Sequence, residues 1–206
     1  MIKVVFLDID GVLNVLSDSY TTLMKPCDSH MDEIFVHRLN YIVEQTNAKV
    51  VISSSWKSDM LNVRQHLIKF GFRYMDNLIG RTPHGNELQK LTGVDPEDSW
   101  LRGLQIQESM KDIVKYYGEI ESYVVLEDEI SDVCGNMCNA IPRKNVIEVS
   151  TSEGLSHSNA VDAKDILNGI NLEERDIAIQ ELFDGGMRGM YLWQAKEAFY
   201  KNLNKG

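Results

Sequence analysis

The sequence predicts an α/β fold of three layers, in which helices cover both faces of a doubly wound, mostly parallel sheet. Apolar runs of strand length occur at residues 3–8, 48–53, 122–127 and 145–149. Helical patterns separate these runs, and strands that alternate with helices form βαβ units with parallel strands. Two acids, Asp8 and Asp10, end the first run. Because ligands of such sheets bind beyond the carboxyl ends of strands, these acids mark the expected site.

The helices follow from the spacing of apolar residues. Residues 32–46 begin at Asp32, a favourable N-cap. Their apolar residues lie on one stripe, which includes Phe35, Leu39 and Ile42. Similar stripes occur at residues 58–70, 103–117 and 160–167. Each stripe can pack one side of its helix against the sheet.

The chain of 206 residues is long enough for one domain with an appendage. We expect the core domain at residues 1–169 and a helical appendage at residues 170–206. Within the appendage, two plausible helices, residues 172–183 and 189–203, flank Asp184-Gly185-Gly186. The appendage either packs back on the core or forms a dimer contact, so a monomer and a homodimer both remain open.

Composition excludes some classes of protein. The formal net charge of −10 and the pI of about 4.9 disfavour a broad surface for nucleic acid or anionic membrane, although a local basic pocket remains possible. No apolar run approaches the roughly 20 residues of a membrane span. Acids interrupt the first apolar run, so it is no signal peptide. Three cysteines, an odd number, fit a reducing compartment, and we expect a cytoplasmic protein with structural thiols.

The acid pair has a chemistry of its own. Asp8 and Asp10 are two residues apart on one strand face, and Gly11 lets the chain leave the strand sharply. Close carboxylates repel each other unless a cation or proton lies between them. An oxygen-rich site of this kind suits Mg²⁺. Taken alone, the pattern could equally be a strand that ends in an acidic turn.

The stretch FLDIDGVLN, residues 6–14, resembles the first motif of the haloacid dehalogenase (HAD) superfamily in its phosphatase form. The wider resemblance is to small HAD domains of phage and bacterial nucleic-acid end-repair phosphatases, and it covers about residues 1–168. The second motif is a strand that ends in Ser or Thr, which Ser53 matches. The third motif is a lone cation, for which Arg102 is the candidate. The fourth is an acidic pair, Glu127 and Asp128, where family members often carry two aspartates.

The resemblance implies roles for these residues. Asp8 would be the nucleophile that forms an aspartyl-phosphate, and Asp10 would be the general acid and base. Mg²⁺ would be bound by Asp8, the backbone carbonyl of Asp10, and Asp128, with Glu127 as the second choice. The hydroxyl of Ser53 would bind a phosphate oxygen.

Other side chains would hold the rest of the substrate. The amide of Ser54 would bind phosphate beside Ser53, and Arg102 would be the fixed cation, with Lys111 or Lys57 as substitutes. Residues 14–31 and 71–101 are too short for an independent cap domain, so we expect a minimal cap or none. In the second segment, Arg81 and His84 are candidates for substrate selection, although they could be plain turn residues. Trp56 is expected to pack in the core or rim, or to stack a base.

The expected function is therefore Mg²⁺-dependent hydrolysis of phosphomonoesters, with a nucleotide or another small phosphorylated metabolite as substrate. The net charge favours a small substrate over a long polyanion. The first alternative is a polynucleotide 3′-phosphatase of DNA or RNA end repair, which the resemblance suggests directly. The second is a non-catalytic phosphate-binding or regulatory protein, although such a protein would not need Asp8, Asp10, Ser53 and Asp128 together.

Overall fold

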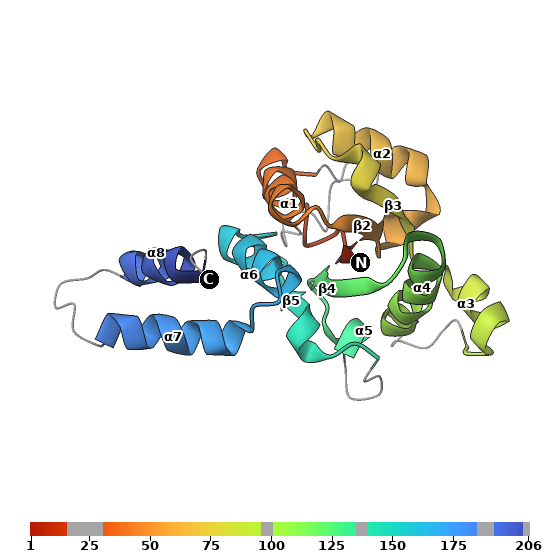
Figure 1. Ribbon diagram of the computed structural model, residues 1–206. Helices are drawn as coiled ribbons and strands as arrows, with labels where there is room; N and C mark the ends of the chain where they lie inside the picture. Colours follow the sequence, from red (N-terminus) through yellow and green to blue (C-terminus); the bar gives the residue numbers. More distant parts are fainter. Residues whose placement is uncertain (16–30, 96–100, 135–139, 185–191, 204–206) are drawn as a thin grey trace.

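The computed structural model describes residues 1–15, 31–95, 101–134, 140–184 and 192–203. A five-stranded sheet forms its centre, with the strand order β3-β2-β1-β4-β5 (Figure 1). The strands are Ile2–Leu7 (β1), Lys49–Ile52 (β2), Leu78–Arg81 (β3), Ile120–Glu127 (β4) and Val146–Glu148 (β5). Every neighbouring pair is parallel. The predicted three-layer α/β fold is confirmed.

The central strand β1 shows why the sheet is covered on both sides. Val4, Val5, Phe6 and Leu7 have no exposed surface. Their side chains alternate between two clusters, because successive residues of a strand point to opposite faces. Val5 and Leu7 join one cluster, and Val4 and Phe6 join the other. A strand buried on both faces is an uninterrupted apolar run, and this is the pattern that the sequence shows.

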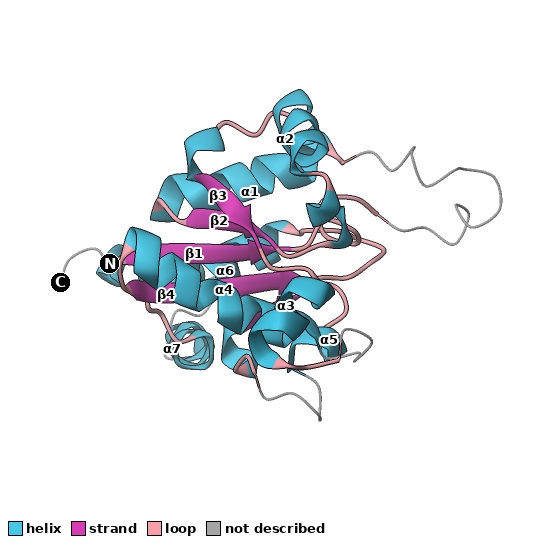
Figure 2. Cartoon of the chain, turned by 90° about the vertical axis from the view of Figure 1, so that its right-hand side faces the viewer, coloured by secondary structure: helices cyan, strands magenta, loops and turns pink. Residues whose placement is uncertain are grey.

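Helices form the outer layers (Figure 2). The cluster around Val5 and Leu7 packs against α1 (Glu33–Thr46), α2 (Met60–Lys69) and α6 (His157–Leu167). The cluster around Val4 and Phe6 packs against α4 (Leu101–Tyr117) and the short α5 (Ser131–Cys134). Short 3₁₀ turns lie at Ser55–Ser58 (η3), Met75–Asn77 (η4) and Arg143–Asn145 (η5).

Helix α1 illustrates how local chemistry sets the boundaries. The Asp32 side chain accepts a hydrogen bond of 2.8 Å from the amide of Ile34, as expected of the predicted N-cap. The helix ends at Asn47, whose φ of 52° lies in the left-handed region that asparagine tolerates. These signals are local, and the helix therefore lies where the sequence predicts it.

The structure departs from the sequence-based elements in two places. Strand β3 was not predicted: its four residues carry no apolar alternation, and it pairs only with β2 at an edge of the sheet. The helix expected at residues 58–70 is shorter, because η3 precedes it and Asp59 caps α2 through the amide of Asn62. Residues 71–95 contain η4, β3 and α3 (Gly85–Thr92), and this segment extends the sheet and builds no separate cap. Most of residues 14–31 lies outside the described residues.

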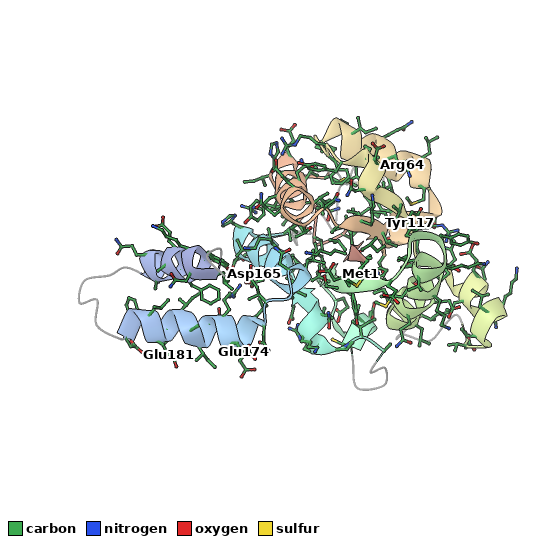
Figure 3. All side chains as sticks on the ribbon, in the orientation of Figure 1. Met1, Arg64, Tyr117, Asp165, Glu174 and Glu181 are labelled. Atoms are coloured by element: carbon green, nitrogen blue, oxygen red, sulfur yellow. The ribbon has the colours of Figure 1, made fainter. Side chains whose placement is uncertain are left out.

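The C-terminal helices α7 (Leu172–Asp184) and α8 (Leu192–Leu203) form a hairpin beside α6, away from the sheet (Figure 1). Asp165 of α6 lies at the junction with this hairpin (Figure 3). Its carboxylate accepts hydrogen bonds from Arg175 of α7 at 2.8 Å and Tyr200 of α8 at 2.5 Å. The boundary at residue 169 and a dimer contact through the hairpin stay predictions. Among the helices that the structure describes, none combines the length and apolar character needed to span a bilayer.

Candidate active site at the carboxyl edge of the sheet

The backbone of the sheet gathers the predicted residues at one edge. Leu7 at the end of β1 lies opposite Ile52 of β2 and Leu126 of β4. The ladder continues one residue further, since the amide of Asp8 donates to Leu126 at 3.0 Å and that of Ser53 donates to Leu7 at 2.7 Å. Parallel strands end on the same side, so residues distant in sequence meet there.

Three acids lie together at this edge. Asp8, Glu127 and Asp128 each offer a carboxylate oxygen, and these oxygens lie within 4.8 Å of one another. Asp8 is 4% exposed and Glu127 is fully buried. Burial, and next the charge of Asp8, raise the pKa of both Glu127 and Asp128. A cluster of hard oxygen ligands with unfavourable mutual repulsion fits a divalent cation such as Mg²⁺.

The loop after β1 brings backbone against one of these acids. Gly11 has a φ of 71°, and a β-carbon there would lie 2.1 Å from Oδ2 of Asp128. Only glycine allows this approach, both for its conformation and for space. On the other side, the Thr151 hydroxyl donates to the same Oδ2 at 3.2 Å. The Asp128 carboxylate is thus confined between the two loops.

Arg102, in the first turn of α4, reaches the acidic cluster. Its Nη1 lies 2.6 Å from each carboxylate oxygen of Glu127 and 3.1 Å from Oδ2 of Asp8. Burial disfavours the charged guanidinium, but the charges of Glu127 and Asp8 outweigh it and raise the pKa of Arg102. The side chain is therefore a permanent cation beside the predicted nucleophile.

Of the two substitute cations, the structure brings one toward the site. Lys111 is exposed and pairs with Glu108 at 2.5 Å, about 13 Å along α4 from Arg102 at 1.5 Å per residue. Lys57 is 9% exposed, and its Nζ donates to neutral acceptors, Thr82 Oγ1 at 3.1 Å and Gln105 Oε1 at 2.7 Å. Burial, and then the charge of Arg102, lower the pKa of Lys57 to about 8.

The serine loop after β2 presents an unsatisfied hydroxyl. Ser53 is 1% exposed, and its Oγ has no hydrogen-bond partner within the described part of the chain. A buried hydroxyl without a partner carries a free-energy cost, which an oxygen of a bound anion would relieve. The neighbouring Ser54 is the N-cap of η3, where its Oγ accepts from the Trp56 amide at 3.5 Å. The loop is therefore shaped before any anion binds.

Asp10 has surroundings that sequence reasoning did not foresee. The indole Nε1 of Trp56 donates to both carboxylate oxygens, at 3.0 and 3.1 Å. The Asn14 amide donates to Oδ1 at 3.0 Å. Trp56 was expected only to pack or to stack a base, because 46 residues separate it from Asp10 and no local signal joins them. Its position directly after the serine run is the one hint that the sequence offered.

The two proposed substrate-selecting residues lie at the end of β3. Arg81 forms a two-pronged pair with Glu87, at 2.8 and 3.0 Å, and Glu87 also accepts from the His84 amide at 2.7 Å. The bond from Arg81 lowers the pKa of Glu87 to about 2, and burial lowers that of His84. A hollow of about 660 Å³ begins at Arg81 and extends between α3 and α4 to Tyr116 and Tyr117.

These features define a HAD-type domain, with its acid pair and its serine loop at the ends of neighbouring strands and its cation in the first turn of α4. A family model for the HAD domain in Swiss Army Knife RNA repair proteins matches residues 4–160, and the chain belongs to this family. Searches of curated proteins and of solved structures found no match. Membership supports a phosphatase-type hydrolase that binds metal. The matched residues contain the whole candidate site and end before the α7–α8 hairpin.

Proposed function

We propose that this protein is a Mg²⁺-dependent phosphomonoester hydrolase with Asp8 as its nucleophile. The observation that carries the proposal is the buried cluster of Asp8, Glu127 and Asp128, with Arg102 at 3.1 Å from Asp8. A nucleophilic carboxylate attacks an anionic phosphate only where fixed positive charge offsets their repulsion. Arg102 supplies part of that charge, and the acid cluster is suited to hold the rest.

The reaction proceeds in two displacements. A carboxylate oxygen of Asp8 attacks phosphorus, the bond to the leaving oxygen breaks, and Asp10 protonates that oxygen as it leaves. An aspartyl-phosphate remains on Asp8. Asp10 then takes a proton from water as the water oxygen attacks phosphorus, and inorganic phosphate departs with Asp8 regenerated. Mg²⁺, when bound, would supply positive charge that offsets the repulsion between the two anions.

Asp8, Asp128 and the backbone carbonyl of Asp10 would hold the metal. We rank Asp128 above Glu127 as a ligand because both oxygens of Glu127 lie 2.6 Å from Nη1 of Arg102. Glu127 then holds Arg102 in place, and Arg102 faces Asp8. The hydroxyl of Ser53, which has no partner in the described chain, and the amide of Ser54 bind the phosphate oxygens. Lys57 adds a second cation to this site.

A phosphorylated nucleotide or other small metabolite is the substrate that we infer. The net charge of −10 opposes the approach of a long phosphate chain. Arg81 lines the hollow between α3 and α4, although neither His84 nor the acid cluster lines it. We infer that Arg81 and His84, at the end of β3, contact the non-phosphate part of such a substrate. The ion pair with Glu87 orients the Arg81 guanidinium and offsets its charge. Arg81 therefore contributes to substrate binding through hydrogen bonds more than through net charge.

One observation favours a second candidate, a 3′-phosphatase that acts on RNA ends. The family that matches residues 4–160 is described as the HAD domain of RNA repair proteins. Arg102 and Lys57 also place two cations at this site of an acidic protein, where they can face a terminal phosphate. Residues 71–95 build no separate cap, which suits the end of a strand as well as a mononucleotide.

Steady-state kinetics separate these candidates. Purified protein is assayed with Mg²⁺ against phosphorylated metabolites, 3′-mononucleotides and 3′-phosphorylated RNA oligomers of increasing length. A small-molecule enzyme shows no gain in kcat/KM with length. An RNA-end enzyme gains with each nucleotide until its groove is filled and loses that gain at high salt, because counterions are released on binding. Phosphate binding without turnover of any substrate would identify a non-catalytic protein and contradict the proposal.

A further inference from the structure

In the part of the chain that the structure describes, the carboxylate of Asp10 accepts hydrogen bonds from neutral donors only. Trp56 Nε1, Asn14 Nδ2 and the Ser55 hydroxyl all donate to it, the last at 3.4 Å. Within the described residues, no lysine, arginine or histidine forms an ion pair with Asp10, whereas Asp8, two residues away, pairs with Arg102. The fold therefore gives these two acids, which follow the same strand, partners of different charge.

This difference matches the different work of the two acids in the proposed reaction. Asp8 must stay ionised to attack phosphorus, and a neighbouring cation favours that form. A general acid and base must carry a proton at one step and release it at another, so a permanent cation in contact with it would oppose one of the steps. Neutral donors orient such a carboxylate and bias its charge less than a cation in contact with it would.

The two oxygens of Asp10 are not equivalent. Oδ1 accepts two hydrogen bonds of 3.0 Å, from Trp56 and from Asn14. Oδ2 accepts a bond of 3.1 Å from Trp56 and only the long bond from Ser55. Oδ2 consequently has more capacity to carry a proton, and the indole, which bridges both oxygens, sets the direction in which Oδ2 faces.

Trp56 is itself held from two sides. It lies in η3, where its amide faces Ser54 Oγ and its carbonyl accepts from the Asp59 amide at 3.1 Å. Its ring meets the ring of His66 edge-on, with centroids 5.4 Å apart. His66 stacks in turn on Phe70 of the same helical face at 6.4 Å. Helix α2 thus fixes the indole in space.

We propose that Trp56 is a positioning residue that aims Asp10 for proton transfer through Oδ2. This inference rests on the proposed phosphatase function. In the first displacement, the O–H bond at Oδ2 breaks as the proton passes to the leaving oxygen, while the phosphorus–oxygen bond breaks. In the second, Oδ2 takes a proton from the attacking water. The indole N–H stays bonded to the carboxylate throughout and exchanges no proton.

Leaving-group dependence tests this role. Trp56→Phe removes the N–H donor and keeps an aromatic ring against His66. An alkyl phosphate such as β-glycerophosphate needs protonation of its leaving oxygen, whereas 4-nitrophenyl phosphate, with an acidic leaving group, needs it far less. We expect Trp56→Phe to lower kcat for β-glycerophosphate by about 10- to 100-fold, with KM within about twofold. The loss with 4-nitrophenyl phosphate should be several-fold smaller.

Ile68→Ala is the control on the same helix. Ile68 is 60% exposed on α2 and takes no part in the aromatic stack that holds Trp56, so both substrates should keep kcat near that of the wild type. A double-mutant cycle adds a second criterion: in an Asp10→Asn background, Trp56→Phe should cause no further loss with either substrate. Equal losses for both leaving groups, a raised KM as the main effect, or additive losses in the cycle would each overturn the positioning role.

A measurement without turnover checks the contact itself. In ¹⁵N-tryptophan-labelled protein, the indole N–H resonance that disappears in Trp56→Phe should move upfield and exchange faster with solvent in Asp10→Ala. An unchanged resonance would contradict the hydrogen bond and the inference with it. If Asp10→Asn keeps wild-type turnover of both phosphates, the proposed mechanism fails as well. If Asp10→Asn is inactive while Trp56→Phe is unaffected, only the inference about Trp56 fails.

Discussion

Arg102 and Arg175 both contact carboxylates that are hidden from solvent, but their surroundings differ. Arg175 binds Asp162 at 2.6 Å, Asp165 at 2.8 Å and Asp176 at 2.8 Å. Oδ2 of Asp165 accepts hydrogen bonds from Arg175 and Tyr200. Oδ1 forms no hydrogen bond in the described chain, but it lies 2.6 Å from the ammonium of Lys164. All these groups come from α6, α7 and α8, which are adjacent in sequence.

The network around Arg102 has fewer cations for its carboxylates. It joins residues of β1, β4 and α4 and leaves three acids within 4.8 Å of one another. Ser53 Oγ has no partner in the described chain, and the described hydrogen bonds of Lys57 go only to neutral acceptors. A network in which each buried carboxylate oxygen has a cation beside it stabilises the fold, whereas a cluster of acids at the strand ends with too few cations is suited to a ligand. The following predictions test this contrast, from the largest expected effect to the smallest.

Asp8→Asn should have the largest effect. The substitution keeps the size of the side chain and removes the nucleophilic charge, so turnover should fall by at least about 10³-fold. The melting temperature should change little, because the variant also relieves repulsion among the three acids. Phosphatase assays and thermal unfolding of the same sample check both parts. Substantial turnover in protein free of wild-type enzyme would remove the covalent mechanism.

Metal removal should abolish turnover, and Mg²⁺ should restore it. Asp128→Ala should raise the Mg²⁺ concentration for half-maximal activity by about 100-fold, and Glu127→Gln by about 10-fold or less, because a direct ligand carries more of the metal affinity than its neighbour. Titration of chelated enzyme with Mg²⁺ gives both values. A larger effect of Glu127→Gln would reverse the ligand assignment.

Arg175→Leu should lower stability and leave activity nearly unchanged. Its removal leaves the buried Asp165 without its arginine, which should lower the free energy of unfolding by about 3–5 kcal/mol. At temperatures where the variant is folded, kcat/KM should stay within about twofold of the wild type. Denaturant unfolding and phosphatase assays measure the two quantities, and Arg143→Leu, at an exposed arginine, is the control. A loss of activity without a loss of stability would link the hairpin to the site.

Lys57→Met should stabilise the protein in the absence of substrate. The pKa of Lys57 is lowered from 10.5 to about 8, so between these values the unfolded chain binds more protons and wild-type stability rises with pH. Below pH 8 the variant should be more stable by about 1–2 kcal/mol, and it should lack this rise. Its affinity for phosphate should fall. Lys111→Met, at an exposed lysine, should change neither stability nor affinity.

Glu87→Gln should have the smallest effect. Glu87 is partly exposed, so its pair with Arg81 should contribute less than about 1 kcal/mol to stability at pH 7. Because its folded pKa is lowered from 4.5 to about 2, this contribution is complete above pH 4.5 and is lost as the pH falls through about 2. The difference in melting temperature between variant and wild type should therefore shrink with acidification. A difference independent of pH would show that Glu87 acts only as a helix cap.

Sequence reasoning succeeded where the signals are local. The apolar run before Asp8, the N-cap at Asp32 and the helical stripe that follows it each lie within a few residues, and the structure has β1 and α1 there. It failed for β3, whose four residues become a strand only because β2 offers an edge. The roles of Asp8, Asp10 and Arg102 in catalysis stay predictions. The structure does bring Asp8 and Arg102 together at the carboxyl edge of the sheet, as the motifs indicated.

By itself, the sequence determined the α/β class, the motif order and the strand ends at which the acids lie, because strand and helix periodicity depend on neighbouring residues. Only the tertiary structure decided that Trp56 bonds Asp10, that Lys57 is buried and Lys111 exposed, and that Arg175 meets Asp165. Lys57 and Lys111 are the same type of residue in the sequence. Their chemistry differs because partners distant in the chain, and the exclusion of water around them, set the free energy of each charge and hydrogen bond.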